Sequence, residues 1–208
     1  MKKKKIDYWN NYYKKKKLTI KQSPFSEFIL KKIKLKNTNI FDAGCGNGRD
    51  TNFFNKNKIN CFGVDKSKEA ILKNKKKYYK FKSNFLNGDF CSLFKKKLKN
   101  NFSVYSRFTW HSINYKQEEK LITNLKNQKK LNYIFIETRT IKDELYNKGK
   151  NVGKHEFITS HYRRFIDPSD LKKKLSKNFK IEYFKVGKNL AKFKKENPCI
   201  LRIIAKPK

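Results

Sequence analysis

The sequence predicts an α/β fold in which helices cover both faces of a mostly parallel sheet. From residue 37 onward, short apolar runs alternate with helix-length segments, and this alternation is the pattern that builds parallel sheets. A glycine turn also follows the first apolar run and leads directly into a helix-compatible segment, as at ligand sites of such sheets. A length of 208 residues fits a single domain, 1–208.

The elements follow from the positions of the apolar runs. The predicted strands are 38–42, 60–64, 102–106, 132–138, 180–186 and 199–205. The predicted helices are 49–57, 66–80, 116–129 and 168–177. Asp65 precedes an acidic first turn and Asp167 precedes a proline, and both are helix-start signals. The last two strands have no helix between them, which predicts a final hairpin.

Residues 1–36 form an aromatic N-terminal segment that contains Tyr8-Trp9-Asn10-Asn11-Tyr12-Tyr13 and leads to a helix starting at Pro24. We expect this segment to fold over the ligand site as a lid, or to anchor the first helix. Residues 37–140 form the expected cofactor half. Residues 141–208 contain a long polar loop with Gly149 and Gly153, the substrate loop, and then the hairpin.

The most informative stretch is the glycine turn, Ile-Phe-Asp-Ala-Gly-Cys-Gly-Asn-Gly-Arg-Asp at 40–50. Glycines let a ligand approach bare backbone, and the following helix adds unpaired N–H groups. The spacing is G-x-G-x-G, which differs from the dinucleotide fingerprint, and no G-K-[ST] follows, which excludes a phosphate loop.

The pattern D-x-G-x-G-x-G-x-D at 42–50 resembles motif I of the class I S-adenosylmethionine-dependent methyltransferases. The resemblance implies a seven-stranded Rossmann-like sheet with an antiparallel last strand, S-adenosyl-L-methionine as cofactor, and a methyltransferase activity. It also implies a set of cofactor-binding residues, which are Asp42, Gly44, Cys45, Gly46, Asn47, Gly48, Arg49, Asp50, Asp65, Lys66, Asp89, Phe90 and Arg107.

Two later acids stand where this family places them. Asp65 ends the second strand 17 residues after Gly48, close to the interval of about 20 residues at which an acid accepts ribose hydroxyls. Asp89 follows Asn87-Gly88 and is expected near the adenine amino group, with Phe90 packed on the ring. Either acid can instead serve only as a helix cap.

The segment Ser106-Arg107-Phe108-Thr109-Trp110-His111 follows the fourth strand and contains no proline. It therefore lacks the motifs of enzymes that methylate nucleic-acid bases, and it resembles small-molecule methyltransferases. If the acceptor is a hydroxyl, a base assists, and His111 and His161 are the two candidates. Arginine suits carboxylate or phosphate binding, and the expected substrate-binding residues are Trp110, Arg139, His155, Tyr162, Arg163 and Arg164.

The chain carries 54 Lys and Arg against 17 Asp and Glu, a formal net charge of +37. This charge indicates either a polyanionic partner or compositional drift. Drift is considered because Lys, Asn, Ile, Phe and Tyr, which are all encoded by A/T-rich codons, are abundant. The favoured function is O-methylation of a small anionic metabolite or sugar. The alternatives are an RNA- or ribosome-associated methyltransferase, with nucleic acid possible but not favoured as a partner, and a non-catalytic basic nucleic-acid-binding protein.

Four cysteines and three histidines show no metal-ligand spacing, so no metal is expected. Separated cysteines predict reduced thiols, and Asp7 and Asn10 interrupt any apolar leader after the basic start. No run approaches the roughly 18 apolar residues of a membrane span. We therefore expect a cytoplasmic protein. A weaker similarity to small bacterial methyltransferases of surface-polysaccharide or sugar modification comes from Glu-Thr-Arg at 137–139 and His-Tyr-Arg-Arg-Phe at 161–165.

Overall fold

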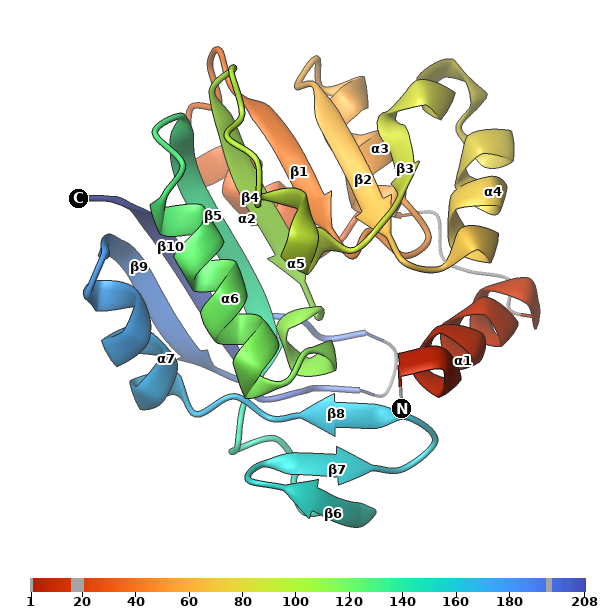
Figure 1. The fold of residues 1–208 in the computed structure, drawn as a ribbon, viewed down its shortest axis with the longest axis vertical. Coiled ribbons are helices and arrows are strands. Elements are labelled where there is room, and N and C mark those ends of the chain that lie inside the picture. The colour runs from red at the N-terminus through yellow and green to blue at the C-terminus, as the bar shows by residue number, and fades with distance from the viewer. Residues whose placement is uncertain (1, 16–20, 194–195) are drawn as a thin grey trace.

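A computed structural model describes residues 2–15, 21–193 and 196–208. Its centre is a seven-stranded sheet with the order β3-β2-β1-β4-β5-β10-β9 (Figure 1). Parallel pairing joins β3, β2, β1, β4 and β5, whereas β10 runs antiparallel to both β5 and β9. The strands are β1 Asn39–Ala43, β2 Cys61–Asp65, β3 Phe85–Asn87, β4 Phe102–Arg107, β5 Leu131–Arg139, β9 Phe179–Gly187 and β10 Ile200–Pro207. The predicted fold class and its antiparallel last strand are confirmed.

The helices cover the sheet on both faces. Their bounds are α1 Lys2–Lys15, α2 Pro24–Lys32, α3 Arg49–Lys56, α4 Lys68–Lys77, α5 Phe90–Leu93, α6 Tyr115–Lys126 and α7 Pro168–Ser176, with short 3-10 helices η1 Tyr79–Asn84 and η2 Trp110–Ser112. Pro24 and Pro168 stand in the first turns of α2 and α7, behind Ser23 and Asp167, whose side chains accept backbone N–H bonds. The predicted starts at Pro24 and Pro168 are therefore confirmed, whereas α4 begins at Lys68 and is capped by Ser67 rather than by Asp65.

Adjacent residues of one strand serve different cores. Val104 faces the cluster that includes α5, α6 and α7, and its neighbour Tyr105 faces the cluster that includes α2 and α3. Ile134 and Phe135 of β5 divide in the same way. Side chains alternate between the two faces of a strand, so a sheet buried on both sides needs continuous apolar runs. This requirement is why the strands could be recognised in the sequence.

The sequence predicts a polar loop after β5. This prediction is wrong, because the segment contains a second sheet. Strands β6 Lys150–Gly153, β7 Glu156–Ile158 and β8 Tyr162–Arg164 pair antiparallel in the order β6-β7-β8. Each strand has three or four residues, too few for an alternating pattern to show in the sequence. This small sheet lies beside the carboxyl ends of the main strands, on the side where α1 also lies (Figure 1).

Two further observations concern the whole described chain. The four cysteines are buried free thiols, with no disulfide among them. Within the described ranges, no helix combines the length and the apolar character needed to cross a bilayer.

Candidate functional site

The glycine turn lies at the carboxyl end of β1 and is held to the end of β2. Gly44, Gly46 and Gly48 have φ values of 81°, 53° and 67°, a region that side chains with a Cβ rarely adopt. The Gly46 N–H donates to Asp65 Oδ2 at 2.9 Å, and the Ser67 N–H donates to Asp65 Oδ1 at 2.8 Å. The turn and Asp65 therefore form one unit, as the sequence predicts. Burial raises the pKa of Asp65.

A Cβ on these glycines would collide with neighbouring side chains. At Gly44 it would lie 2.1 Å from Thr109 Cγ2, and at Gly46 it would lie 2.4 Å from the Tyr13 hydroxyl oxygen. The turn therefore presents bare backbone to the loop after β4 and to α1. Cys45 is buried beneath the turn, and Asn74 of α4 donates to the Gly46 carbonyl at 2.8 Å.

Asp42 lies under the turn rather than on its surface. It is buried and accepts a hydrogen bond from the Thr51 hydroxyl at 2.7 Å. Burial, with the Asp50 charge as the next contribution, raises the pKa of Asp42 to about 8. Asp42 thus links β1 to α3 and fixes the shape of the turn from below.

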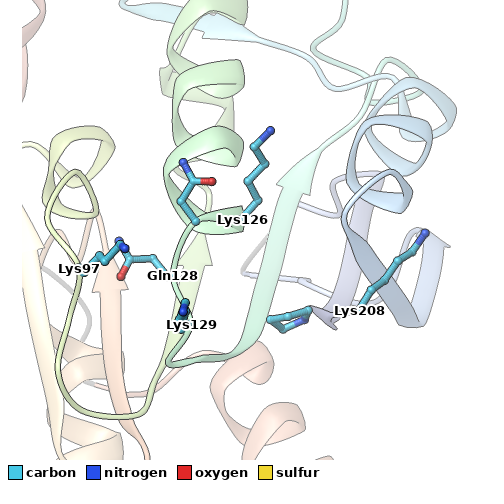
Figure 2. Close-up of a pocket in the computed structure, with 7 residues that line it drawn as sticks. Lys97, Lys126, Gln128, Lys129 and Lys208 are labelled. Atoms are coloured by element: carbon cyan, nitrogen blue, oxygen red, sulfur yellow. The ribbon is translucent and has the colours of Figure 1, made fainter.

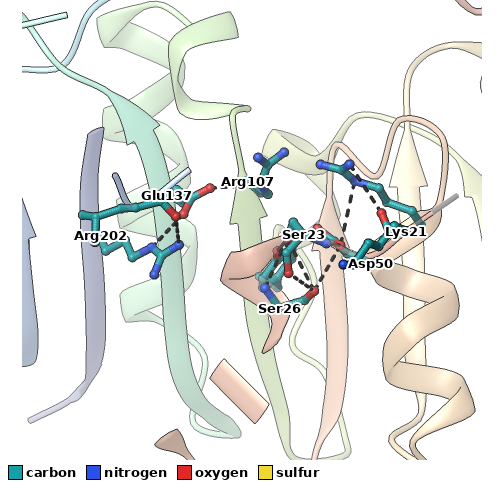
Figure 3. A network of polar contacts seen from close by, with 10 residues as sticks. Lys21, Ser23, Ser26, Asp50, Arg107, Glu137 and Arg202 are labelled. Carbon is teal, nitrogen blue, oxygen red and sulfur yellow. Dashed lines mark hydrogen bonds and ion pairs between the residues drawn. The ribbon is translucent and has the colours of Figure 1, made fainter. Parts of the chain in front are cut away.

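Asp50 and Arg49 contact the segment that leads into α2. Asp50 accepts from the backbone N–H and the hydroxyl of Ser23, both at 2.7 Å, and from the Tyr105 hydroxyl at 2.8 Å. The Ser26 hydroxyl donates to it at 3.1 Å. Arg49 reaches the Lys21 carbonyl at 3.5 Å (Figure 3). With its acceptor oxygens engaged in this buried network, Asp50 has a structural role, and we remove it from the expected cofactor ligands.

The third acid lies at the end of β3. Asp89 Oδ2 is 3.0 Å from Lys66 Nζ, and Asp89 Oδ1 accepts the Cys91 N–H and so caps α5. About a third of its side chain is exposed, so Asp89 remains open to a ligand. Phe90 is buried in the core cluster of α5 and α6. Its packing on the adenine ring stays a prediction.

Arg107 belongs to an ion-pair network inside the sheet. Its Nε lies 2.9 Å from Glu137 Oε1, and Arg202 Nε donates to Glu137 Oε2 at 2.7 Å (Figure 3). Glu137 is fully buried, and its pKa is raised by burial, which the two arginines counteract. The guanidinium of Arg107 also lies over the Phe108 ring, 4.4 Å from the centroid. Arg107 therefore joins β4 to β5, and we remove it from the cofactor set.

Helix α1 crosses from the glycine turn to the small sheet. Near the turn, Ser67 donates to Asn10 Oδ1 at 2.8 Å, and Lys73 Nζ reaches the carbonyls of Tyr13 and Lys14 at 2.6 and 2.9 Å. In the middle of the helix, Tyr8 stacks on His161 with centroids 4.8 Å apart, and the Trp9 ring meets His161 edge-on at 5.0 Å. The aromatic residues of α1 therefore bridge the turn and the substrate loop.

The two histidines lie in a positive environment. His111 is buried and its Nδ1 has no hydrogen-bond partner among the described residues. Burial, together with the charges of Arg163 and Arg139, lowers the pKa of His111 well below its usual range and lowers that of His161 to about 4. Both imidazoles are therefore neutral at pH 7, and their lowered pKa makes them weaker bases than an ordinary histidine.

Arg163 differs from the other five arginines. Each of the others has a carboxylate oxygen within 4.0 Å. Within the described part of the chain, the hydrogen bond of Arg163 goes to the Thr159 hydroxyl at 2.9 Å, and no acid pairs with it. Burial and the neighbouring Arg139 charge lower its pKa. An anion placed beside Arg163 would remove this repulsion.

Several expected substrate residues are engaged within the fold. Trp110 is 1% exposed and lies in the core. Arg164 pairs with Glu118 and donates from Nε to the Ile113 carbonyl at 2.9 Å. Arg139 pairs with Asp143 and Glu196 at 3.0 and 2.8 Å. We therefore remove Trp110 and Arg164 from the substrate set.

The remaining two expected substrate residues lie in the small sheet. His155 Nδ1 is 2.8 Å from the Tyr146 hydroxyl. Tyr162 is buried next to Glu156, and burial is the main cause that raises its pKa. Both residues therefore contact their own loop, and they keep the small sheet in shape.

Several partners that set the geometry of the site could not be recognised in the sequence. Thr109 fills the space beside Gly44, Glu118 neutralises Arg164, and Glu137 holds two arginines at once. Their signal was weak because a lone acid or hydroxyl in a strand or helix reveals no partner in the sequence. Across the described residues, no three His, Cys, Asp or Glu side chains gather as a metal site would require.

Comparisons with known proteins agree on one kind of domain. A family model described as a methyltransferase domain matches residues 40–130, which run from β1 to the turn before β5. No curated protein matches this chain in sequence.

Solved structures share the fold at low sequence identity. A SAM-dependent methyltransferase from Methanosarcina mazei superposes with a TM-score of 0.71 at 16% identity, covering 86% of this chain and 96% of that one. One from Anabaena variabilis gives 0.68 at 16% identity, covering 97% and 93%. The glycopeptide N-methyltransferase MtfA in complex with S-adenosyl-L-methionine gives 0.65 at 10% identity, covering 90% and 95%.

Proposed function

We propose that this chain is a class I S-adenosylmethionine-dependent methyltransferase and that it methylates an oxygen atom of a small anionic metabolite or sugar. The observation that carries this proposal is Arg163, a half-buried guanidinium without a carboxylate partner in the described chain, next to two neutral imidazoles. Such a cluster favours a ligand that brings its own negative charge.

The residues present fit the cofactor of this family. The glycines of the turn carry no side chain and have positive φ angles, and the Asp65 carboxylate is fixed at the same turn by the backbone N–H groups of Gly46 and Ser67. In our proposal Asp65 accepts the ribose hydroxyls and Asp89 lies near the adenine. When bound, the cofactor supplies a methyl group on a sulfonium that is already a good leaving group. Cys45, Asn47, Gly48 and Lys66 complete the proposed cofactor side.

Methyl transfer then depends mainly on alignment, because holding two reactants in line can contribute several kcal/mol. We propose that Arg163 orients the anionic group of the acceptor and that His161 or His111 takes the hydroxyl proton. The contacts of Tyr8 and Trp9 with His161 support a role for α1 as a lid that excludes water from this region. Exposed lysines lie on α2, α4, α6 and α7 and are not confined to the surroundings of the glycine turn, which supports a small acceptor over a nucleic-acid substrate.

The acceptor is tested by a turnover screen on matched pairs. Release of S-adenosyl-L-homocysteine is measured with sugar, nucleotide and carboxylate acceptors, and each active anion is compared with its neutral ester or amide. We expect the anions to be preferred by about tenfold or more, since one hydrogen bond to a charged group contributes about 1.5–3 kcal/mol. Equal turnover of the anionic and neutral forms would reject the anion-binding role.

Replacing Arg163 with glutamine should raise the KM of the anionic acceptor by about 10- to 100-fold, because the charge-assisted contacts are lost. The affinity for S-adenosyl-L-methionine should not change, since Arg163 is not part of the glycine turn. Steady-state kinetics with the best acceptor from the screen, beside a cofactor titration, measure both quantities. As a matched control, Lys154→Gln removes an exposed positive charge from the same loop and should change neither. A KM that stays constant in Arg163→Gln would contradict the assignment.

The proximity of Arg163 to His161 predicts a measurable titration shift. The pKa of His161 is lowered to about 4 by burial first and then by Arg163 and Arg139, so the Arg163→Gln variant should titrate at higher pH. Nuclear magnetic resonance of labelled histidine, with His155 as internal reference, follows both proteins from pH 8 to pH 4. Because a histidine with a lowered pKa favours the folded state less as pH falls from 6.5 towards 4, the contribution of His161 to stability should decline over the same interval. An identical His161 midpoint in both proteins would show that Arg163 is too distant to act.

A further inference from the structure

A basic groove lies at the amino ends of the parallel strands β4 and β5. The candidate site lies at the opposite, carboxyl ends of the parallel strands. The groove has a volume of about 730 Å³ and is lined by Lys97, Lys126, Asn127, Gln128, Lys129, Pro207 and Lys208 (Figure 2). Lys97 precedes β4, residues 126–129 join α6 to β5, and Lys208 follows β10. The glycine turn and Asp65 instead lie at the carboxyl ends of β1 and β2. A molecule in the groove is therefore remote from the methyl-transfer site.

Four of the seven lining residues are lysines and none is acidic. The adjacent exposed positions add Lys95, Lys96, Lys99 and Lys130. Glu182 of the hairpin is paired with Lys206 at 2.7 Å. The lining lysines therefore crowd like charges together without an acidic side chain among them, which costs free energy.

The walls of the groove are held in place by the fold. The Gln128 side chain is buried, and its Nε2 donates to the carbonyls of Phe94 and Lys96 at 2.8 and 3.0 Å. Its Oε1 accepts the Leu98 N–H at 3.0 Å. One glutamine therefore fixes the loop that carries Lys97 against the turn that carries Lys129. A preformed groove loses less conformational entropy on binding than a set of independent surface lysines.

Helix stabilisation does not account for the whole groove. Lysines near a helix C-terminus interact favourably with the helix dipole, and this effect explains Lys126 at the end of α6. Lys97 and Lys208 belong to other elements, a loop and the end of a strand, so the dipole gives no reason for them. Convergence of three separate segments on one acid-free groove points to a ligand with several negative charges.

We propose that this groove binds the phosphate backbone of a nucleic-acid duplex, independently of the base sequence. The lining contains no aromatic side chain on which an unpaired base could stack, whereas lysine ammonium groups suit phosphates. The bound duplex tethers the protein and is not the methyl acceptor, because the groove lies at the amino ends of the parallel strands and the glycine turn lies at their carboxyl ends. The proposal does not depend on which small acceptor is methylated.

The test compares two variants that lose the same number of charges. The groove variant carries Lys97→Gln, Lys126→Gln, Lys129→Gln and Lys208→Gln. The control variant carries Lys75→Gln, Lys76→Gln, Lys80→Gln and Lys82→Gln, four exposed lysines on α4 and η1. Fluorescence anisotropy with a labelled 20-base-pair DNA duplex of mixed sequence gives the association constant at several salt concentrations. Circular dichroism confirms that each variant is folded, and S-adenosyl-L-methionine affinity should match that of the unmodified chain.

We expect the unmodified chain to bind the duplex with a steep salt dependence. The slope of log K against log salt should become shallower by about 3–4 in the groove variant, since each lost phosphate contact removes about 0.9. The control variant should keep most of the original slope. Equal losses in both variants would show that only the net charge matters and would overturn the proposal, as would absence of duplex binding by the unmodified chain at 50 mM salt.

Discussion

Replacing Asp65 with asparagine is expected to weaken S-adenosyl-L-methionine binding by about 100-fold. In the structure the Asp65 carboxylate is oriented by the N–H groups of Gly46 and Ser67, and in our proposal it also accepts two ribose hydroxyls. Hydrogen bonds to a charged acceptor contribute about 1.5–3 kcal/mol each. Loss of about 3 kcal/mol corresponds to the stated change in dissociation constant. Isothermal titration calorimetry measures it directly.

The control for this experiment is Glu119→Gln, which removes an exposed carboxylate from α6. Both variants lose one negative charge, so a general electrostatic effect would weaken them equally. Only Asp65→Asn should lose affinity. If its dissociation constant stays within about twofold of the original, Asp65 does not hold the ribose, and the proposed cofactor geometry is wrong.

Glu137→Gln is expected to destabilise the fold by about 3–5 kcal/mol, the cost of breaking a buried ion pair while leaving a partner charged. Glu137 is fully buried between Arg107 of β4 and Arg202 of β10. The loss is a large part of the roughly 5–15 kcal/mol that stabilises a typical protein. Urea denaturation followed by circular dichroism gives the change in free energy of unfolding.

A surface carboxylate on the neighbouring strand serves as comparison. Glu182 of β9 pairs with Lys206 and Lys180, and exposed pairs of this kind contribute little. Glu182→Gln should therefore leave the urea midpoint nearly unchanged. A similarly small effect of Glu137→Gln would mean that its two arginines find other partners, and the network would then not be what joins β4, β5 and β10.

The sequence predicted the sheet well because its strands are buried on both faces. Val104 and Tyr105 both had to be apolar or aromatic, although they face different cores, and this requirement produces visible runs. Helix starts were equally readable at Pro24 and Pro168, where local geometry restricts the residue type. The glycine turn was readable because its positive φ angles favour glycine.

The site was predicted less completely, because charged residues look alike in a sequence whether they face a ligand or another residue. Asp50 fits the family pattern, yet it accepts hydrogen bonds from Ser23, Ser26 and Tyr105. Arg164 and Arg163 are neighbours in β8, and only the first has an acidic partner, Glu118. Successive side chains of a strand point to opposite faces of the sheet, so Arg163 and Arg164 have different surroundings. The strand β8 was too short to be recognised in the sequence.

The most direct test of the central claim is a crystal structure of the chain with S-adenosyl-L-homocysteine. We expect the ribose hydroxyls to lie within hydrogen-bond distance of Asp65, with the ligand against the backbone of Gly44 and Gly46 and the adenine near Asp89. Well-ordered ligand located elsewhere, or a ribose without contact to Asp65, would contradict the account.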